Sequence, residues 1–283
     1  MKHKHLLPGF ALDLSVVDPE DGLPWDFSLP HKRDKARAMR RRQRPYMVIG
    51  SPECTQFSTL QAINVARSRD PSVYRRAKAK AILHMNFMAE LYREQMEDDH
   101  YFLHEHPRWA TSWDLPEIDK LLQVPSVGLV RGDQCQYGAE AQSGAEKGSP
   151  IMKPTGFMSN SEAVLEELSK RCDAVDGYCS RLSRTCTVSA TLSSSPSMPE
   201  KHASCTGRRA KDASRYPRAL CRAMLRGVTR QLRRDELLKN GCYGMQVPDD
   251  DAAVERSMMG PAQGFSGKFR DDLSGQVLLS LHT

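Results

Sequence analysis

The feature that most constrains the fold is the alternation of short apolar segments with helical patterns. Residues 73–97 carry apolar side chains at three- and four-residue spacing, which is typical of a helix packed against a core. Short apolar segments precede and follow this helix. Alternating strands and helices favour an α/β fold, with a parallel or mostly parallel sheet and helices on both faces. The strand-like segments are 10–17, 46–49, 101–107 and 127–130.

Composition divides the chain into packed and unpacked parts. The hydrophobic content of 39% and the mean hydropathy of −0.57 are low for a compact chain of 283 residues. Part of the chain is therefore expected to lie outside the core. We expect a disordered start at 1–9, an α/β domain at 10–160, an irregular linker at 161–206, a basic helix packed on the domain at 207–238 and a disordered tail at 239–283.

A proline restricts where one further predicted strand can lie in the sheet. Residues 151–160 have strand-like composition and contain Pro154. Proline has no backbone N–H and cannot donate to a strand ladder. The segment is therefore predicted to be an edge strand.

The charge and the apolar runs restrict the compartment and the partners. The formal net charge of +6 and the pI of about 8.9 suit a polyanionic partner such as DNA, without identifying one. The polar first ten residues supply no signal-peptide core. No apolar run approaches the roughly 20 residues of a membrane span. We expect an intracellular protein, nuclear or cytoplasmic, with no membrane partner; protein partners and oligomeric state are left open.

Eight cysteines are expected to be thiols in a reducing compartment. Cys172, Cys179 and Cys186 recur every seven residues. Zinc sites usually contain a Cys-x2-4-Cys pair, which this sequence lacks. The two interpretations are a metal site and spaced thiols in a loop. We expect no metal.

One cysteine has a physical reason to react. The apolar segment Tyr46–Ile49 leads through a Gly-Ser-Pro turn to Cys54, where a helix can begin. Backbone N–H groups and the positive end of a helix dipole favour the thiolate, which is the nucleophilic form. The alternative is a packed, inert cysteine at a strand-loop-helix corner.

Acidic residues stand near the ends of two predicted strands. Asp13 interrupts the strand at 10–17, and Glu105 lies near the end of the strand at 101–107. Open α/β sheets bind ligands at the carboxyl ends of their strands, where an acidic residue can accept hydrogen bonds from ribose. Asp13 can equally be a solvent-facing strand residue. Cys54 and Glu105 are predicted to share one edge of the sheet.

A basic helix is predicted at 31–44, where eight Lys/Arg accompany one Asp. Its cluster can contact phosphates, serve as a nuclear import signal or form a solvated helix face. The cluster consists of Arg40, Arg41, Arg42 and Arg44.

These residues together suggest a family. The stretch Gly50-Ser-Pro-Glu-Cys54-Thr-Gln-Phe-Ser58 resembles the Gly-x-Pro-Pro-Cys-x-x-Phe-Ser loop of cytosine-5 DNA methyltransferases. Leu103-His-Glu-His-Pro107 resembles the later family strand that ends Glu-Asn-Val. The pattern, with the stretch 153–160, is also similar to methyltransferase-like domains in retrotransposon polyproteins of some unicellular eukaryotes. The resemblance covers residues 10 to about 160 and, loosely, 207–234.

The resemblance implies a fold, an activity and residue roles. The implied fold is a Rossmann-like class I methyltransferase sheet. The implied activity is transfer of a methyl group from S-adenosylmethionine to C5 of cytosine. Cys54 would attack C6 of the base, and Glu105 would hold N3. Tyr216-Pro217 is similar to the start of the helix that closes the domain beside the cofactor. The implied cofactor residues are Asp13, Trp25, Asp26 and Pro52, and Lys153 is the nearest counterpart of the family's base-side arginines.

Departures from the family lead us to expect a degenerate, incomplete domain. The family's first strand and its Gly-rich loop have no room before Ala11, and Glu53 replaces a loop proline. No sizeable target-recognition domain is evident. The alternative function is a non-catalytic nucleic-acid-binding remnant of a mobile-element polyprotein.

Overall fold

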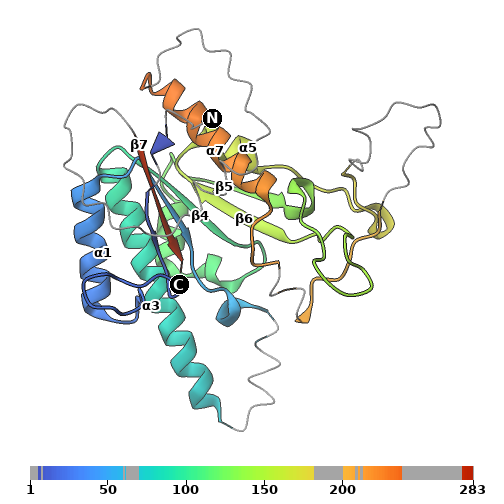
Figure 1. Cartoon of the computed structure of the whole chain (residues 1–283), viewed down its shortest axis with the longest axis horizontal. Helices are drawn as coiled ribbons and strands as arrows, with labels where there is room; N and C mark the ends of the chain where they lie inside the picture. Colours follow the sequence, from blue (N-terminus) through green and yellow to red (C-terminus); the bar gives the residue numbers. More distant parts are fainter. Residues whose placement is uncertain are drawn as a thin grey trace.

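The computed structural model describes residues 6–7, 9–59, 61, 70–181, 200–207, 210, 213–237 and 276–282. Strands and helices are assembled around one mixed sheet (Figure 1), so the predicted α/β class is confirmed. The strands are β1 (Leu6–Leu7), β2 (Ala11–Leu12), β3 (Met47–Ser51), β4 (Tyr101–Pro107), β5 (Gly128–Asp133), β6 (Pro154–Ser159) and β7 (Gln276–His282). The α-helices are α1 (Pro30–Gln43), α3 (Pro71–Glu97), α4 (Pro116–Leu122), α5 (Glu162–Leu168) and α7 (Arg218–Arg234). The 3-10 helices are η1 (Thr55–Phe57), η2 (Thr111–Asp114), η3 (Gln134–Tyr137) and η4 (Val175–Gly177).

The sheet places the ends of β3 and β4 side by side. The strand order is β1-β7-β3-β4-β6-β5, and β2 also pairs with β7. β3 is parallel to β4 in a register that sets Met47 opposite Tyr101 and Gly50 opposite His104. Both strands therefore end at the same edge. The predicted shared edge of Cys54 and Glu105 is confirmed.

The strand that contains Pro154 lies inside the sheet. β6 is antiparallel to β4 on one side and to β5 on the other. The prediction of an edge strand is therefore wrong. Pro154 is the first residue of β6 and lies opposite Asp133. Proline is tolerated at that first position, where its missing N–H interrupts little of the ladder.

Alternate residues of the strands build the core on the two faces of the sheet. Val48 and Phe102 belong to a buried cluster with side chains of α1, α3 and α4. Their neighbours Met47, Ile49 and Leu103 belong to a second cluster with α5 and α7. This alternation follows from the two-residue period of a strand. Helices therefore cover both faces, with α7 lying across the sheet in Figure 1.

Local sequence signals set the start of two helices. α3 follows Asp70, whose side chain accepts a hydrogen bond from the backbone N–H of Ser72 at 2.8 Å, and Pro71 occupies the first turn. α5 follows Ser161, whose side chain accepts from the backbone N–H of Val164. Both contacts are N-caps. Each gives an acceptor to a backbone N–H of the first turn, which has no partner within the helix.

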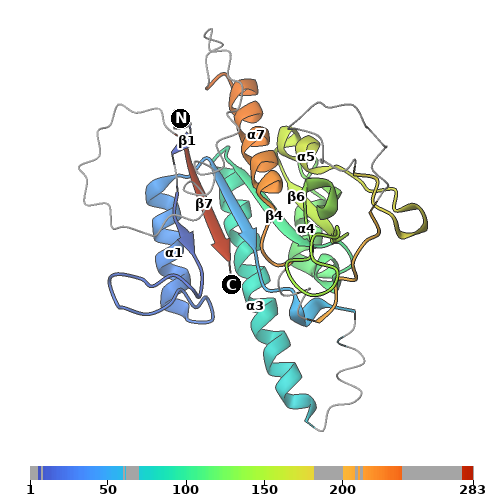
Figure 2. The same ribbon diagram turned by 45° about the vertical axis from the view of Figure 1, so that its right-hand side comes forward.

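The last strand of the sheet comes from the far end of the chain. The sequence predicts a disordered tail at 239–283, of which 239–275 and Thr283 lie outside the described residues. Gln276–His282 instead forms β7, parallel to β3 from Met47 opposite Leu278 to Ser51 opposite His282. Figure 2 shows β7 running beside β3. Of the predicted start at 1–9, residues 1–5 and 8 are outside the described part, as are 182–199 of the predicted linker.

Candidate functional site

The carboxylate of Glu105 is the centre of a buried polar group at the carboxyl edge of β3 and β4. Glu105 is 4% exposed. The hydroxyl of Ser51 donates to its Oε2 at 2.7 Å, and the hydroxyl of Tyr216 donates to the same oxygen at 2.8 Å. The two hydroxyls also lie 2.9 Å apart. Residues from β3, β4 and the segment before α7 are thus joined at one carboxylate.

The second oxygen of Glu105 is left for another partner. Its Oε1 is buried and accepts no hydrogen bond from the residues that the structure describes. A buried acceptor without a donor costs free energy, so most such atoms in proteins are paired. The arrangement therefore fixes one oxygen of the carboxyl group and leaves the other without a donor among the described residues.

Cys54 shares the electrostatic environment of Glu105. Cys54 lies two residues after the buried Pro52 and directly before η1. Burial raises the pKa of its thiol, the charge of Lys153 lowers this pKa, and the charge of Glu105 raises it. The net direction is upward, which favours the thiol over the thiolate. The helix after Cys54 is the three-residue η1 as far as the structure describes it, and so short a helix provides little of the expected dipole.

Two buried histidines complete this edge of the sheet. His106 has its Nδ1 2.7 Å from the hydroxyl of Ser112, and burial lowers its pKa to about 4. His104 stacks on it with ring centroids 5.7 Å apart, and burial holds its pKa well below the usual range. Both imidazoles are neutral at pH 7. They therefore act as packed polar groups beside Glu105.

Trp25 does not have the surface position that an adenine-binding role requires. It is 3% exposed and packs 6.5 Å from Phe27 between ring centroids. The amino groups of Lys32 and Lys35 lie over its ring, at 5.0 and 5.4 Å from the centroid. The structure corrects the expectation, because Trp25 is a core residue that supports a cation–π contact.

The other implied cofactor residues have local partners. Asp13 accepts a hydrogen bond from the backbone N–H of Ser15. Asp26 accepts from the backbone N–H of Ser28 at 2.9 Å and lies 3.4 Å from the amino group of Lys80. Pro52 is buried. These contacts account for each side chain as part of a turn or loop.

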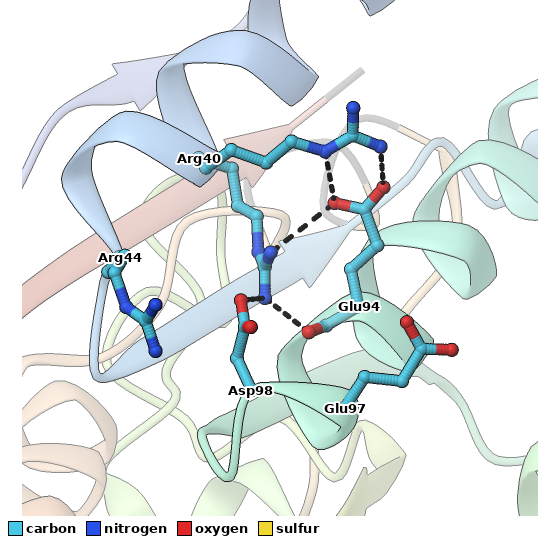
Figure 3. A pocket seen from close by; sticks show the side chains of 6 residues that line it. Arg40, Arg44, Glu94, Glu97 and Asp98 are labelled. Carbon is cyan, nitrogen blue, oxygen red and sulfur yellow. Dashed lines mark hydrogen bonds and ion pairs between the residues drawn. The ribbon is translucent and has the colours of Figure 1, made fainter.

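Two of the four arginines of the predicted basic cluster are paired with carboxylates within the chain. Arg40 is 2% exposed and pairs with Asp98 at 2.7 Å and with Glu94 (Figure 3). Arg41 also pairs with Glu94. Together with Arg44 and Glu97, these side chains line a pocket of about 320 Å³. This pocket lies where β3 and β4 begin, at the edge opposite to Cys54.

The expected phosphate contacts need revision accordingly. Arg40 and Arg41 hold α1 against the end of α3, whereas Arg42 and Arg44 are exposed. Phosphate contact by those two arginines stays a prediction. Lys153, the nearest counterpart of the family's base-side arginines, donates to the carbonyl oxygen of Ala213 at 3.2 Å.

A cluster of three cysteines and a histidine overturns the expectation of no metal. Cys135 follows β5, Cys172 and Cys179 flank η4, and His202 follows the segment outside the described residues. Their ligand atoms all lie within 4.8 Å of one another, and the three cysteines are buried. Sulfur and imidazole nitrogen are the ligands that zinc and related metals prefer.

Sequence reasoning missed several of these residues for identifiable reasons. Ser51 was treated as part of a turn, although it is the last residue of a strand beside the predicted nucleophile. Cys135 and His202 are far apart in the sequence and form no short metal motif. Tyr216 was noted only as a helix start, where Tyr-Pro was the available signal.

Comparison of the chain with protein-family models, with curated proteins and with solved structures finds no match. Among the described residues, none of the helices combines the length and the apolar composition needed to cross a bilayer.

Proposed function

We propose that this chain is a degenerate domain of the cytosine-5 DNA methyltransferase type that retains the base-binding half of the site. The observation that carries the proposal is the Glu105 carboxylate, which is fixed through Oε2 by Ser51 and Tyr216 and has a free Oε1. Cytosine presents an exocyclic amino group, which can donate to such an oxygen, and N3, which can accept from it when the carboxyl group is protonated. Cys54 lies at the same edge, as the resemblance to the family requires.

The chemistry follows from the positions of the two residues. The Cys54 thiolate would form a bond to C6 of the base, and the displaced electron pair would make C5 nucleophilic. Glu105 in its protonated form would donate to N3, hold the ring and stabilise the negative charge that develops on it. C5 would then accept a methyl group or a solvent proton, and loss of a proton from C5 with departure of the thiolate would restore the ring. The base must leave its stack to reach the site, at a cost of a few kcal/mol.

Two observations support the degenerate form over a fully active one. Burial raises the pKa of the Cys54 thiol, so the nucleophilic form is disfavoured. Trp25 is buried in the core, away from the role that the resemblance implies. Both affect methyl transfer more than base binding.

The test separates attack on the base from methyl transfer. DNA carrying tritium at C5 of cytosine is incubated with the full chain without a methyl donor, because attack at C6 alone exchanges this hydrogen with water. We expect slow tritium release that is lost in Cys54→Ser and reduced in Glu105→Gln. Cys205→Ser is the matched thiol control and should release tritium as the unaltered chain does. Release at the same rate from the Cys54→Ser variant would refute the assignment. A parallel incubation with labelled S-adenosylmethionine measures transfer itself.

A second candidate is nucleic-acid binding without catalysis, and an exposed tryptophan favours it. Trp109 is 63% exposed and follows β4, at the edge where Glu105 lies. The guanidinium groups of Arg108 and Arg131 lie 5.1 and 5.9 Å from its ring centroid. An aromatic ring flanked by arginines can stack a base while the charges attract phosphates.

Salt-dependent binding of single-stranded and duplex DNA tests this candidate. Trp109→Ala should weaken binding to single strands by roughly 1–3 kcal/mol, the usual worth of one stacked base. Trp109→Phe should restore most of that loss, and Cys54→Ser should leave binding unchanged. Equal affinities for the unaltered chain and Trp109→Ala would exclude Trp109 as the stacking residue.

A further inference from the structure

The ligand atoms of Cys135, Cys172, Cys179 and His202 all lie within 4.8 Å of one another, and two of their separations can be compared with a tetrahedral metal site. The sulfur atoms of Cys172 and Cys179 are 3.9 Å apart, and Nε2 of His202 is 3.6 Å from the sulfur of Cys172. With Zn–S near 2.3 Å and Zn–N near 2.0–2.1 Å, a tetrahedron requires ligand separations of about 3.8 Å for S···S and about 3.6 Å for S···N. The two observed separations agree with this geometry.

The histidine is oriented as a metal ligand. Its Nδ1 lies 3.0 Å from the carbonyl oxygen of Gly177, which accepts only if Nδ1 carries the proton. The lone pair is then on Nε2, the atom that faces the thiols. Metal-binding histidines usually have this second contact to a carbonyl or carboxylate, which fixes the ring and its tautomer.

The backbone around the cluster is shaped to bring the ligands together. The backbone N–H of Cys179 donates to Glu200 and that of His202 donates to Gly177, each at 2.8 Å, so the two ligand segments are paired. The backbone N–H of Ser180 points to the sulfur of Cys172 at 3.4 Å. In the loop between Cys172 and Cys179, three residues have left-handed φ angles, namely Ala174, Asp176 and Gly177. Left-handed conformations at non-glycine residues are uncommon, and here they turn the chain tightly enough for both thiols to meet.

Two alternatives account less well for the arrangement. A disulfide between Cys172 and Cys179 would need a sulfur separation of about 2.05 Å, whereas the atoms are 3.9 Å apart. Thiols packed only as small apolar groups would not require a histidine nitrogen among them. Four convergent ligands from three separate segments are best explained by a shared ion.

We propose that Cys135, Cys172, Cys179 and His202 bind one Zn²⁺ ion in a closed structural site. Four protein ligands fill a tetrahedral zinc, so no position is left for water or a substrate. The ion joins η3, the loop around η4 and the segment at His202. Next to His202, the backbone N–H of Ala203 donates to the carbonyl oxygen of Pro150. The site thus joins the loop that follows α5 to the described segment at His202.

Metal content and cobalt spectroscopy test the proposal on the full chain. We expect one equivalent of zinc in the purified protein. After exchange to Co²⁺ we expect the intense visible bands of tetrahedral cobalt and a near-ultraviolet thiolate charge-transfer band. Cys179→Ser should bind Zn²⁺ more than about tenfold more weakly. The matched control is Cys205→Ser, a cysteine close in sequence to His202 but outside the cluster, which should keep full zinc content and the cobalt spectrum.

A measurement on the unaltered chain covers the case in which Cys179→Ser does not fold. Removal of zinc by a chelator should lower the Tm, and addition of Zn²⁺ should restore it. No zinc after purification and no uptake from added Zn²⁺, a cobalt spectrum without the thiolate band, or unchanged affinity in Cys179→Ser would each overturn the proposal. These readouts do not depend on DNA or on methyl transfer, so they are independent of the proposed function.

Discussion

At the residue scale, the Glu105 carboxylate depends on hydroxyls that come from distant parts of the sequence. Ser51 ends β3, and Tyr216 precedes α7. The hydrogen bonds of these two hydroxyls compensate for the burial of a polar group, which is costly without partners. The same contacts therefore serve both the stability of this edge and the orientation of the free oxygen.

Removing one of these hydroxyls should destabilise the fold. Tyr216→Phe keeps the ring but leaves the buried Glu105 with one donor, so we expect the free energy of unfolding to fall by about 1–3 kcal/mol. Tyr178→Phe is the control, since Tyr178 is 43% exposed. Urea unfolding measures both variants. Equal stability of the two would contradict the role assigned to Tyr216.

His106 should make stability depend on pH in the acidic range. Burial lowers its pKa from the ordinary value of 6.5 to about 4, so the unfolded chain binds more protons than the folded chain between these values. Stability attributable to this group is therefore full above pH 6.5 and falls as the pH decreases. The expected loss from pH 7 to pH 4 is about 3 kcal/mol.

Urea unfolding at several pH values checks this expectation. His106→Gln should show a shallower decline with acid than the unaltered chain. Parallel profiles for His106→Gln and the unaltered chain would rule out His106 as the source.

At the element scale, α1 is joined to the end of α3 by ion pairs, although its sequence suggests a nucleic-acid contact. Arg40 donates from Nε to the side-chain oxygen of Gln95 at 2.9 Å, in addition to its pairs with Glu94 and Asp98. Gln95 in turn donates to the carbonyl oxygens of Pro45 and Tyr101. The network therefore connects two helices to the starts of two strands.

Breaking this network should cost far more than removing a surface arginine. Arg40→Ala removes a buried cation that pairs with the partly exposed Glu94 and Asp98, and we expect a loss of about 1–3 kcal/mol. Arg42→Ala, in the same helix but exposed, should change stability by less than about 0.5 kcal/mol. Thermal and urea unfolding give the comparison. A small effect of Arg40→Ala would mean that the pairs contribute little net stability.

At the scale of the whole molecule, the sheet is closed by a strand from the opposite end of the sequence. β7 pairs with β1, β2 and β3, so it connects the N-terminal strands to the rest of the sheet. The strand that lies between β1 and β3 therefore comes after α7 in the sequence. The order of the sheet thus differs from the order of the sequence.

A protein that ends at residue 275 should be markedly less stable than the full chain. It loses the five register pairs between β7 and β3 and leaves β3 with an unpaired edge. We expect a Tm lower by at least about 4 °C, the shift that corresponds to 1–2 kcal/mol. A protein that ends at His282 keeps the whole strand and is the control. Identical melting of the two would show that β7 does not stabilise the sheet.

The sequence by itself determined the features that depend on neighbouring residues. The apolar stripe of 73–97 predicted α3 within a few residues, and the Glu105 strand was predicted with its observed bounds at 101–107. The shared edge of Cys54 and Glu105 followed from two strands separated by one helix. These inferences succeeded because periodicity and the direction of parallel strands are local or nearly local properties.

Only the tertiary structure decided the features that join distant segments. It buried Arg40, which stands in a run of basic residues, and Trp25, which the resemblance assigns to the cofactor, and it placed the strand of Pro154 inside the sheet. It also brought Cys135 to His202 and Tyr216 to Glu105. The physical reason is that these contacts are set by strand order and loop paths, which no spacing in a single segment encodes.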